Sequence, residues 1–342
     1  MTVPAQRRRV HGMLAATASL GVAALLAGCG GGNATPSNAP SEPGEAVAAD
    51  PYAPEITDLK VTGIAGPGTI PVAVAADLTA SDYGITIEFV PADNSGVAVT
   101  SVVSGDVATA NTSYFGVIDA INQGLPLVVI AEGWASTPET GFLMARPGSG
   151  IESLADLEGK NVNVISLTSS HAIKLRAAMI AEGLDPDAVN WVELPYAEVA
   201  AAFEQGTIDA SSAVGPTLAA VRGLGATPVF DYAEGEYNGM AESGFVSSVD
   251  FVTQYPNATA ALQCALFKAQ GMLHEDRALF ESTFMSFLGA PEAAAKADIM
   301  LDFQTENRLD ALQKNVEVYS ASGLLSQEID FAEHTLPTPT NC

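Results

Sequence analysis

Basic side chains are scarce in this sequence. It has 14 lysines and arginines against 40 aspartates and glutamates, which gives a net charge of −26. A surface of this kind repels the phosphates of nucleic acids and the headgroups of anionic lipids. We therefore exclude nucleic acid as a partner.

Cysteine and histidine are also rare, with three and four residues respectively. The histidines are too far apart in the sequence for metal-ligand spacing, and three cysteines do not make a metal site. The sequence has no GxSxG elbow and no P-loop. Ser170 and His171 are adjacent, and adjacent residues seldom form a nucleophile and its base. We predict no catalytic residues, no metal and no cofactor, and we expect that the chain is not an enzyme.

Long apolar runs are absent except for one near the start, residues 13–26, which follows three arginines. This run is too short to span a bilayer. It ends in Leu26-Ala27-Gly28-Cys29, a string typical of a lipoprotein processing site. We predict a signal peptide over 1–28 and lipidation of Cys29. The alternative is an ordinary secretory signal with a chance cysteine.

A lipid on Cys29 would tether the chain to the extracytoplasmic face of the cell membrane. One acyl chain holds a protein only marginally, so stable anchoring implies at least two. Residues 29–55 are rich in Gly, Pro, Ser and Ala without an apolar periodicity, which indicates a flexible linker. Loss of the leader would leave 11 basic and 40 acidic side chains, a net charge of −29.

Two cysteines remain for the folded part of the chain, Cys264 and Cys342. In an oxidising compartment two cysteines are more often paired than free. We predict that they form a disulfide, which would pin the C-terminal tail to a helix. Two unpaired thiols are the alternative.

Strands and helices alternate along the first two thirds of the chain. Strands are expected at 58–64, 85–90, 107–110 and 127–131, with helical segments at 66–80, 95–104 and 114–122 between them. A second alternation places strands at 142–145, 161–165, 191–193 and 210–214, with helices at 171–182, 197–205 and 217–224. This order predicts an α/β fold with parallel sheets covered by helices.

The folded part is longer than one compact core usually holds, so two lobes are expected. We predict lobe 1 over 56–143 and 244–342, and lobe 2 over 144–243. Helices expected at 261–273, 278–288 and 309–320 would return to complete lobe 1. The chain should cross between the lobes near 140–147 and 236–246.

One stretch of the second lobe carries a family resemblance. Residues 153–206 read SLADLEGKNVNVISLTSSHAIKLRAAMIAEGLDPDAVNWVELPYAEVAAAFEQG, and residues 207–210 read TIDA. The segment resembles solute-binding proteins of ABC importers for nitrate, sulfonates, taurine and thiamine-precursor pyrimidines. In that family an L-x-D-L-x-G-K turn precedes a strand and a Ser-rich loop precedes a helix. The resemblance extends over nearly all of residues 57–330.

The resemblance implies a two-lobed fold of the type II periplasmic-binding-protein kind, each lobe a mostly parallel sheet flanked by helices. It implies a monomer that binds a small organic solute between its lobes and delivers it to an ABC permease and its ATPase. Two alternatives stay open. One is an enzyme of the same fold, such as one that makes a pyrimidine precursor, and the other is a surface scavenger without a transporter.

In such a fold, ligands bind beyond the carboxyl ends of the strands, where loops turn into helices. Lobe 1 offers two such loops, with backbone amides, hydroxyls and free helix N–H groups. The candidate ligand-binding residues are Gly66, Gly68, Thr69, Asn111, Thr112 and Ser113. A rigid turn at 66–69, or helix capping by one of the hydroxyls, would explain single members without a ligand.

Lobe 2 offers the corresponding loops, and by resemblance its Ser-rich loop is the strongest candidate. The residues predicted to bind are Thr168, Ser169, Ser170, His171, Gly215 and Pro216. Helix capping is the alternative for each hydroxyl. Glycine at 215 leaves more room than the aromatic or acidic residue that the family often has there.

Trp134 follows the strand at 127–131, where its indole could stack on a planar ligand or pack in the core. Glu132 and Glu139 are expected to face solvent. The candidate loops contain no lysine or arginine, although a dianion is normally held by arginine. A monoanion or a neutral polar ring therefore fits these loops better.

Overall fold

The computed structural model describes residues 53–340 and residue 342. The predicted signal peptide, the lipidated Cys29 and most of the predicted linker lie outside the described residues. Among the described helices, none combines the length and the apolar character needed to cross a bilayer.

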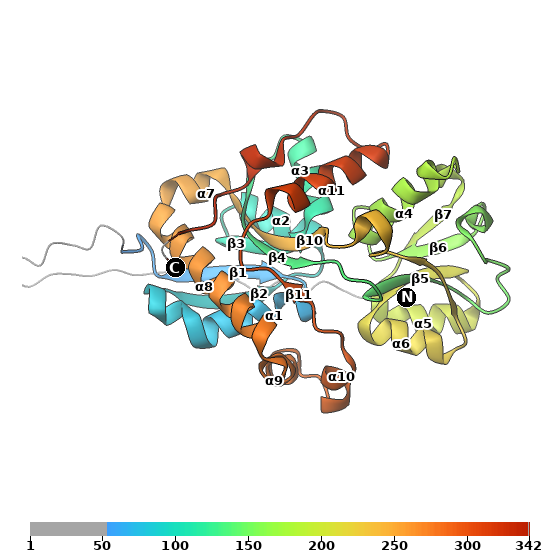
Figure 1. Cartoon of the computed structure of the whole chain (residues 1–342), viewed down its shortest axis with the longest axis horizontal. Helices are drawn as coiled ribbons and strands as arrows, with labels where there is room; N and C mark the ends of the chain where they lie inside the picture. The colour runs from blue at the N-terminus through green and yellow to red at the C-terminus, as the bar shows by residue number, and fades with distance from the viewer. Residues whose placement is uncertain (1–52, 341) are drawn as a thin grey trace, which may run out of the picture. The chain divides into compact units, whose positions relative to one another are not determined.

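The first sheet has six strands in the order β11-β4-β10-β3-β1-β2 (Figure 1). Four of them, β1 to β4, run in one direction, and β10 and β11 run against them. The strands are β1 Asp58–Gly63, β2 Thr86–Pro91, β3 Thr109–Ser113, β4 Leu127–Ala135, β10 Ala241–Ser248 and β11 Asp302–Phe303.

Helices cover both faces of the first sheet. One face packs on α2, α3 and α11 through a core that includes Phe115 and Tyr319. The other face packs on α1, α8 and α9 through a core that includes Leu266 and Phe280. The helical segments are η1 Pro67–Thr69, α1 Ile70–Val74, η2 Ala75–Thr79, η3 Ala80–Tyr83, α2 Ser95–Val103, α3 Tyr114–Asn122, α7 Val249–Gln254, α8 Pro256–Glu275, α9 Arg277–Leu288, α10 Glu292–Ala297, α11 Leu309–Ala321 and η7 Phe331–His334.

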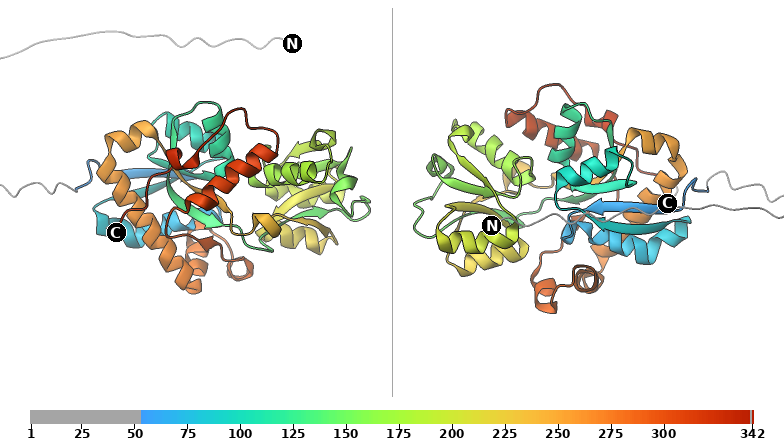
Figure 2. Two further views of the ribbon diagram at one scale, coloured as in Figure 1. Left: turned by 45° about the horizontal axis from the view of Figure 1, so that its top comes forward. Right: turned by 180° about the vertical axis from the view of Figure 1, so that it is seen from behind.

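The second sheet has five strands in the order β7-β6-β8-β5-β9, of which only β5 runs against the rest. Figure 2 shows α4 on one face of this sheet and α5 and α6 on the other. The strands are β5 Gly141–Ala145, β6 Asn161–Val164, β7 Asn190–Glu193, β8 Ala210–Val214 and β9 Thr227–Asp231. The helices are η4 Leu154–Leu157, α4 Ser170–Ala181, η5 Pro186–Ala188, α5 Tyr196–Gln205, α6 Gly215–Gly223 and η6 Gly235–Tyr237.

The chain passes between the sheets twice, at residues 136–140 and 232–240. The strands therefore change sheets three residues before the lobe boundaries expected at 144 and 244. Both strands that follow a crossing, β5 and β10, enter their sheets antiparallel to the neighbours that they pair with. The two sheets are thus mixed, with most of their strands in one direction.

Both ends of the described chain are held against the first lobe. Glu55, at the end of the predicted linker, accepts hydrogen bonds from the backbone of Asn257 and Ala258 at the start of α8. At the other end, Cys342 forms a disulfide with Cys264 of α8. The tail before it also pairs with β4, where Leu336 N donates to Val129 O over 2.9 Å.

Candidate functional site

Five side chains around the carboxyl end of β3 carry a buried polar atom that has no hydrogen-bond partner in the described part of the chain. They are Asn111, Thr112 and Ser113 of β3, Tyr114 at the start of α3, and Ser243 of β10. Asn111, Ser113 and Ser243 form one group among them. Ser113 lies directly opposite Ser243 in the antiparallel pair, so these two side chains share one face of the sheet. Asn111, two residues before Ser113, lies on the same face.

Helix capping does not account for Ser113. It occupies the N-cap position of α3, but its side chain makes no capping hydrogen bond. Leaving a buried donor or acceptor unsatisfied costs about 1–3 kcal/mol per group. Three such groups lie on neighbouring strands at the carboxyl end of β3, which is where ligands bind in open α/β sheets.

Trp134 and Gly68 lie beside Ser243 and Asn111. Trp134 of β4 pairs with Ser243 across the sheet. A Cβ atom added to Gly68 would lie 3.1 Å from Trp134 Nε1 and 3.7 Å from Asn111 Oδ1. The structure therefore places Gly68, Asn111, Ser113 and Trp134 near one another.

The other predicted residues of the first lobe have different surroundings. The Thr69 hydroxyl is used within its own turn, since it donates to Gly66 O over 2.9 Å and accepts from Gly66 N over 3.1 Å. Thr112 points to the opposite face of β3 from its neighbours. Its hydroxyl is also buried without a partner, and a Cβ on Gly116 of α3 would lie 3.7 Å from it.

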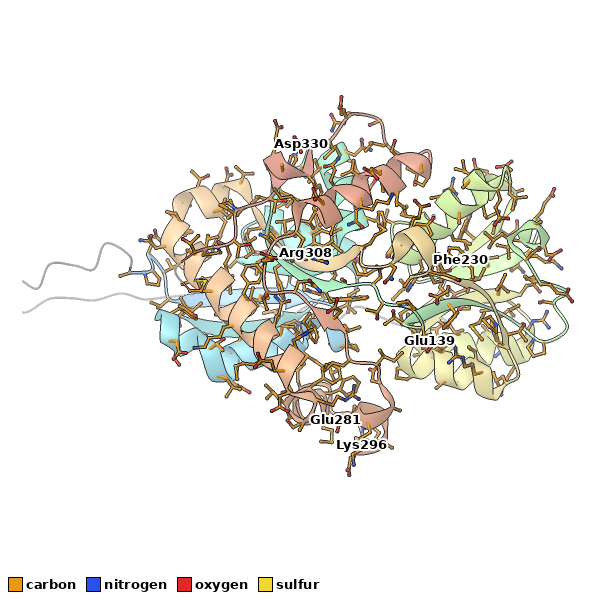
Figure 3. All side chains as sticks on the ribbon, in the orientation of Figure 1. Glu139, Phe230, Glu281, Lys296, Arg308 and Asp330 are labelled. Carbon is orange, nitrogen blue, oxygen red and sulfur yellow. A yellow bond between two sulfur atoms is a disulfide. The ribbon has the colours of Figure 1, made fainter. Side chains whose placement is uncertain are left out.

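The expectation that Glu132 faces solvent is wrong. Glu132 is fully buried, and its carboxylate accepts hydrogen bonds from Arg308 N over 3.0 Å and Arg308 Nε over 3.1 Å. Burial raises the pKa of Glu132, and the Arg308 hydrogen bonds offset this only in part. Figure 3 labels Arg308, and also Glu139 on the link between the sheets, which is exposed as expected.

In the second lobe, the Ser-rich loop before α4 uses two of its hydroxyls internally. Ser169 is the N-cap, since its Oγ accepts from Ala172 N, and it donates to Ser166 O over 2.6 Å. The Thr168 hydroxyl lies 3.1 Å from Ser166 Oγ. These contacts hold the loop in shape through the hydroxyls of Thr168 and Ser169. The Ser170 hydroxyl is not used within the loop.

Ser170 reaches across to the first sheet. Its hydroxyl donates to Glu242 Oε2 on β10, and Glu242 Oε1 accepts from Lys174 Nζ, one turn further along α4. Lys174 also donates to Tyr232 O over 3.0 Å. Burial raises the pKa of Glu242, but the Lys174 ammonium and the hydrogen bonds outweigh it, so the pKa is lowered. Sequence reasoning missed Glu242.

The two lobes meet along β10. Ser170 at the start of α4 bonds to Glu242. The next residue of the strand, Ser243, lies opposite Ser113 at the start of α3. One helix N-terminus from each lobe therefore contacts β10. Helix N-termini favour negative charge through their free N–H groups.

The His171 ring, in the first turn of α4, packs beside Tyr232 and Tyr196. Its ring centroid lies 4.3 Å from that of Tyr232, and its Nδ1 lies 3.3 Å from Tyr196 OH. A Cβ on Gly141 would lie 3.1 Å from its Nε2. Burial lowers the pKa of His171 to about 4, so the ring is neutral at pH 7.

This shift predicts a pH-dependent stability. Between the unfolded pKa of 6.5 and about 4, the unfolded chain binds a proton that folded His171 does not, so stability falls as the pH falls. We expect His171 to contribute a loss of about 2 kcal/mol between pH 7 and pH 5. Urea unfolding at both pH values measures it, and His171→Gln should lose that part of the difference. An equal difference in the variant would contradict the assignment.

Gly215 and Pro216 begin α6. Gly215 has a φ of +44°, a conformation that favours glycine, and Pro216 is exposed. Val214, the residue before them, pairs with Gly141 of β5. Gly215 therefore directly follows Val214, which pairs with Gly141, and the His171 ring packs against Gly141.

Three basic side chains near these loops are paired with carboxylates, and a fourth, Arg222, lies over the Phe142 ring. Arg146 pairs with Asp209 over 2.9 Å, Arg176 with Asp187 over 2.7 Å, and Lys174 with Glu242. An anionic group would therefore be bound by amide N–H groups, hydroxyls and helix N-termini. This chemistry suits a singly charged oxyanion.

Two further observations concern the rest of the described residues. No group of three or more His, Cys, Asp or Glu side chains among them could hold a metal ion. A surface cavity of about 430 Å³ lies between the C-terminal ends of α4 and α11, lined by Arg176 and Gly323 among others. Its lining includes none of Asn111, Ser113, Ser170 and Ser243.

Comparison with known proteins shows the family of this chain. A family model described as NMT1/THI5 like matches residues 81–277, more than half of the chain. The taurine-binding periplasmic protein of Escherichia coli strain K12 is 25% identical over 208 residues, covering 58% of this chain and 61% of that protein. The match thus spans about three fifths of the length of this relative.

Solved structures share the fold. The alkanesulfonate-binding protein SsuA from Xanthomonas axonopodis pv. citri, bound to MOPS, has a TM-score of 0.66 at 19% identity and covers 82% of this chain and 99% of its own. The desulfurization enzyme DSZB has a TM-score of 0.58 at 18% identity, covering 81% and 96%. These likenesses confirm the two-lobed, periplasmic-binding-protein-like fold. The family resemblance in the sequence is confirmed as well: this chain belongs to the NMT1/THI5-like family.

Proposed function

We propose that this chain binds a small organic monoanion, with sulfonates the first class to test, between its two lobes and delivers it to the permease of an ABC importer. The observation that carries the proposal is the set of unpartnered polar groups on Asn111, Ser113 and Ser243, together with the bond from Ser170 of the second lobe to Glu242, the residue before Ser243. The names of the relatives support the ligand class, since one binds taurine and one binds alkanesulfonates.

The lobes give this function a mechanism. A ligand that contacts both lobes only when they are closed shifts the equilibrium toward the closed form. The closed form is then the one that the permease recognises. We propose two lobes whose bounds lie close to the predicted ones, 56–135 with 241–342 and 141–231, joined by the crossings at 136–140 and 232–240.

A lipid on Cys29 would keep the binding protein beside its permease, on the extracytoplasmic face of the membrane. We propose that residues 1–28 are removed, that Cys29 carries at least two acyl chains, and that 29–55 is the tether of a monomer. Labelling with a radioactive fatty acid tests this, and Cys29→Ala should abolish the label.

A ligand panel tests the binding function. We expect at least one of the sulfonates to stabilise the purified chain in a thermal-shift assay, with nitrate, aromatic carboxylates and pyrimidines as the other classes. A ligand at a hundredfold its dissociation constant adds about 2.7 kcal/mol to the stability. Stabilisation by none of these classes would contradict the proposal. Conversion of the bound compound would favour the enzyme reading, for which the likeness to DSZB is the supporting observation.

Asn111 should contribute directly to the binding energy. Its Nδ2 is a donor without a partner, and a hydrogen bond to an anion is worth about 1.5–3 kcal/mol. We expect Asn111→Ala to weaken binding of the best ligand by roughly tenfold to a hundredfold in calorimetric titrations.

Asn315→Ala is the matched control for this prediction. Asn315 is also a buried asparagine and has an unpartnered oxygen, but it lies on α11. Its replacement should leave the affinity unchanged. Equal losses in both variants would mean that Asn111 acts only through stability.

A further inference from the structure

The indole N–H of Trp134 is a donor that no other described residue uses. Trp134 is half-buried near the end of β4, and its Nε1 makes no hydrogen bond within residues 53–340 and 342. The sequence has one other tryptophan, Trp191, which donates its Nε1 to Pro186 O over 2.9 Å. A buried indole N–H usually finds a hydrogen-bond partner of this kind. Trp134 thus differs from Trp191 in having an N–H available to an acceptor from outside the chain.

Gly68 keeps this N–H uncovered. A Cβ atom added to Gly68 would lie 3.1 Å from Trp134 Nε1 and 3.6 Å from Trp134 Cδ1. A side chain at position 68 would therefore stand against the edge of the indole that carries the hydrogen. The φ angle of Gly68 lies outside the left-handed region, so the backbone conformation does not itself require glycine. The close approach of the indole does.

The same position borders the unpartnered amide of Asn111. The Cβ added to Gly68 would lie 3.7 Å from Asn111 Oδ1, and Asn111 Nδ2 is buried without a partner in the described part of the chain. Trp134 pairs with Ser243, and Ser243 pairs with Ser113, so these side chains share one face of the sheet. N–H donors from β4 and β3 therefore border one position that stays open because residue 68 has no side chain.

We propose that Trp134 binds the ligand as a hydrogen-bond donor through Nε1, and that Gly68 is the specificity-determining residue that keeps this donor open. The inference rests on the proposed function. An indole N–H can donate but cannot accept, so this position requires an acceptor atom on the ligand. A compound that presents an apolar group or a donor there leaves the N–H unpaired, which lowers its affinity.

Two other roles for Trp134 make different predictions. If the face of the indole stacked on a planar ligand, phenylalanine would replace it with little loss of affinity. If the indole only packed against the turn at Gly68, ligand binding would leave the N–H in an unchanged environment.

Nuclear magnetic resonance of the two indole N–H groups tests the donor role in the unmodified chain. We would titrate the isotope-labelled chain with methanesulfonate and with nitrate, and assign the two signals with Trp134→Phe and Trp191→Phe. Binding of either anion should move the Trp134 proton signal downfield, as a hydrogen bond to an anion does, and leave the Trp191 signal in place. A stationary Trp134 signal while calorimetry shows binding would overturn the inference and leave the binding function intact. Binding of neither anion would count against the anionic ligand class proposed above, and this inference would fall with it.

Affinities of matched variants test the same pair of residues independently. Trp134→Phe keeps an aromatic ring without the N–H and should weaken methanesulfonate binding by roughly tenfold. Gly68→Ala should weaken it by a similar factor, because the added methyl group covers the N–H. The controls are Trp191→Phe, whose N–H is bonded within the second lobe, and Gly223→Ala, where a Cβ would meet no atom within 4 Å. Both controls should keep the affinity. An unchanged affinity in Trp134→Phe, or equal losses in Trp134→Phe and Trp191→Phe, would contradict the donor role.

Discussion

Replacing Lys174 by methionine is expected to destabilise the chain by about 3–5 kcal/mol, because it leaves the carboxylate of Glu242 buried without its counter-charge. The side chains of Lys174 and Glu242 are only 1% and 7% exposed. The same pair connects α4 of the second lobe to β10 of the first. Urea unfolding of Lys174→Met measures the loss.

Two further variants show whether the loss comes from the unpaired charge. Removing both partners, in Lys174→Met with Glu242→Leu, should recover most of the stability, because apolar side chains can replace a buried ion pair at little cost. Ser170→Ala, which removes only the hydroxyl on the same carboxylate, should cost about 1–2 kcal/mol. A loss below 1 kcal/mol in Lys174→Met would show that the pair is solvated in the protein.

The ion pair of Lys174 and Glu242 also makes the stability of the folded chain depend on pH. Because Lys174 lowers the pKa of Glu242 below its ordinary 4.5, the stability that Glu242 contributes is complete above that value. It is lost as the pH falls through the lower folded-state pKa. This loss comes in more acidic solution than the His171 loss, so the two can be separated in a pH series.

Removing the disulfide between Cys264 and Cys342 should have an effect of similar size. The two residues are 78 apart in sequence, and closing a loop of this length is worth about 4 kcal/mol in the chain-entropy model. For a chain of this size that corresponds to a fall of roughly 8 °C in the melting temperature. Calorimetry of Cys264→Ala with Cys342→Ala measures it.

The tail provides the control for this prediction. Asn307 Nδ2 donates to Leu336 O over 2.7 Å and Gln263 Nε2 donates to Pro337 O over 3.2 Å, so the tail has other contacts with the lobe. Adding a thiol reductant should lower the melting temperature of the unmodified chain toward that of the double variant and leave the variant unchanged. A double variant that melts with the unmodified chain would show that the bridge adds nothing beyond these contacts.

Most of the fold could be predicted because its elements have clear periodicity. The helix at 114–122 has the bounds expected for it, since its apolar residues recur at helical spacing. Strand β10 was not predicted, because its first residues, Ala241-Glu242-Ser243-Gly244, are small or polar and do not alternate as a half-buried strand does. The antiparallel entry of β5 and β10 also has no local signal, since it depends on where the chain crosses between the lobes.

The loops of the candidate site were predicted from the sequence, but the ion-pair partners of its buried carboxylates were not. Glu132 and Glu242 are buried because Arg308 and Lys174 reach them from distant segments, and a single sequence shows no such pairing. One signal was available for Lys174. It lies four residues after Ser170 on the same helix face, and it is flanked by the apolar residues Ile173 and Leu175. A lysine in such surroundings indicates a buried counter-charge.

A crystal structure of the chain with the tightest ligand of the panel would locate the binding site. We expect the anionic group of the ligand within hydrogen-bond distance of Asn111 Nδ2 and Ser113 Oγ, with Ser170 contacting the same molecule from the other lobe. A ligand seated in the cavity between α4 and α11, or one that touches only one lobe, would contradict it.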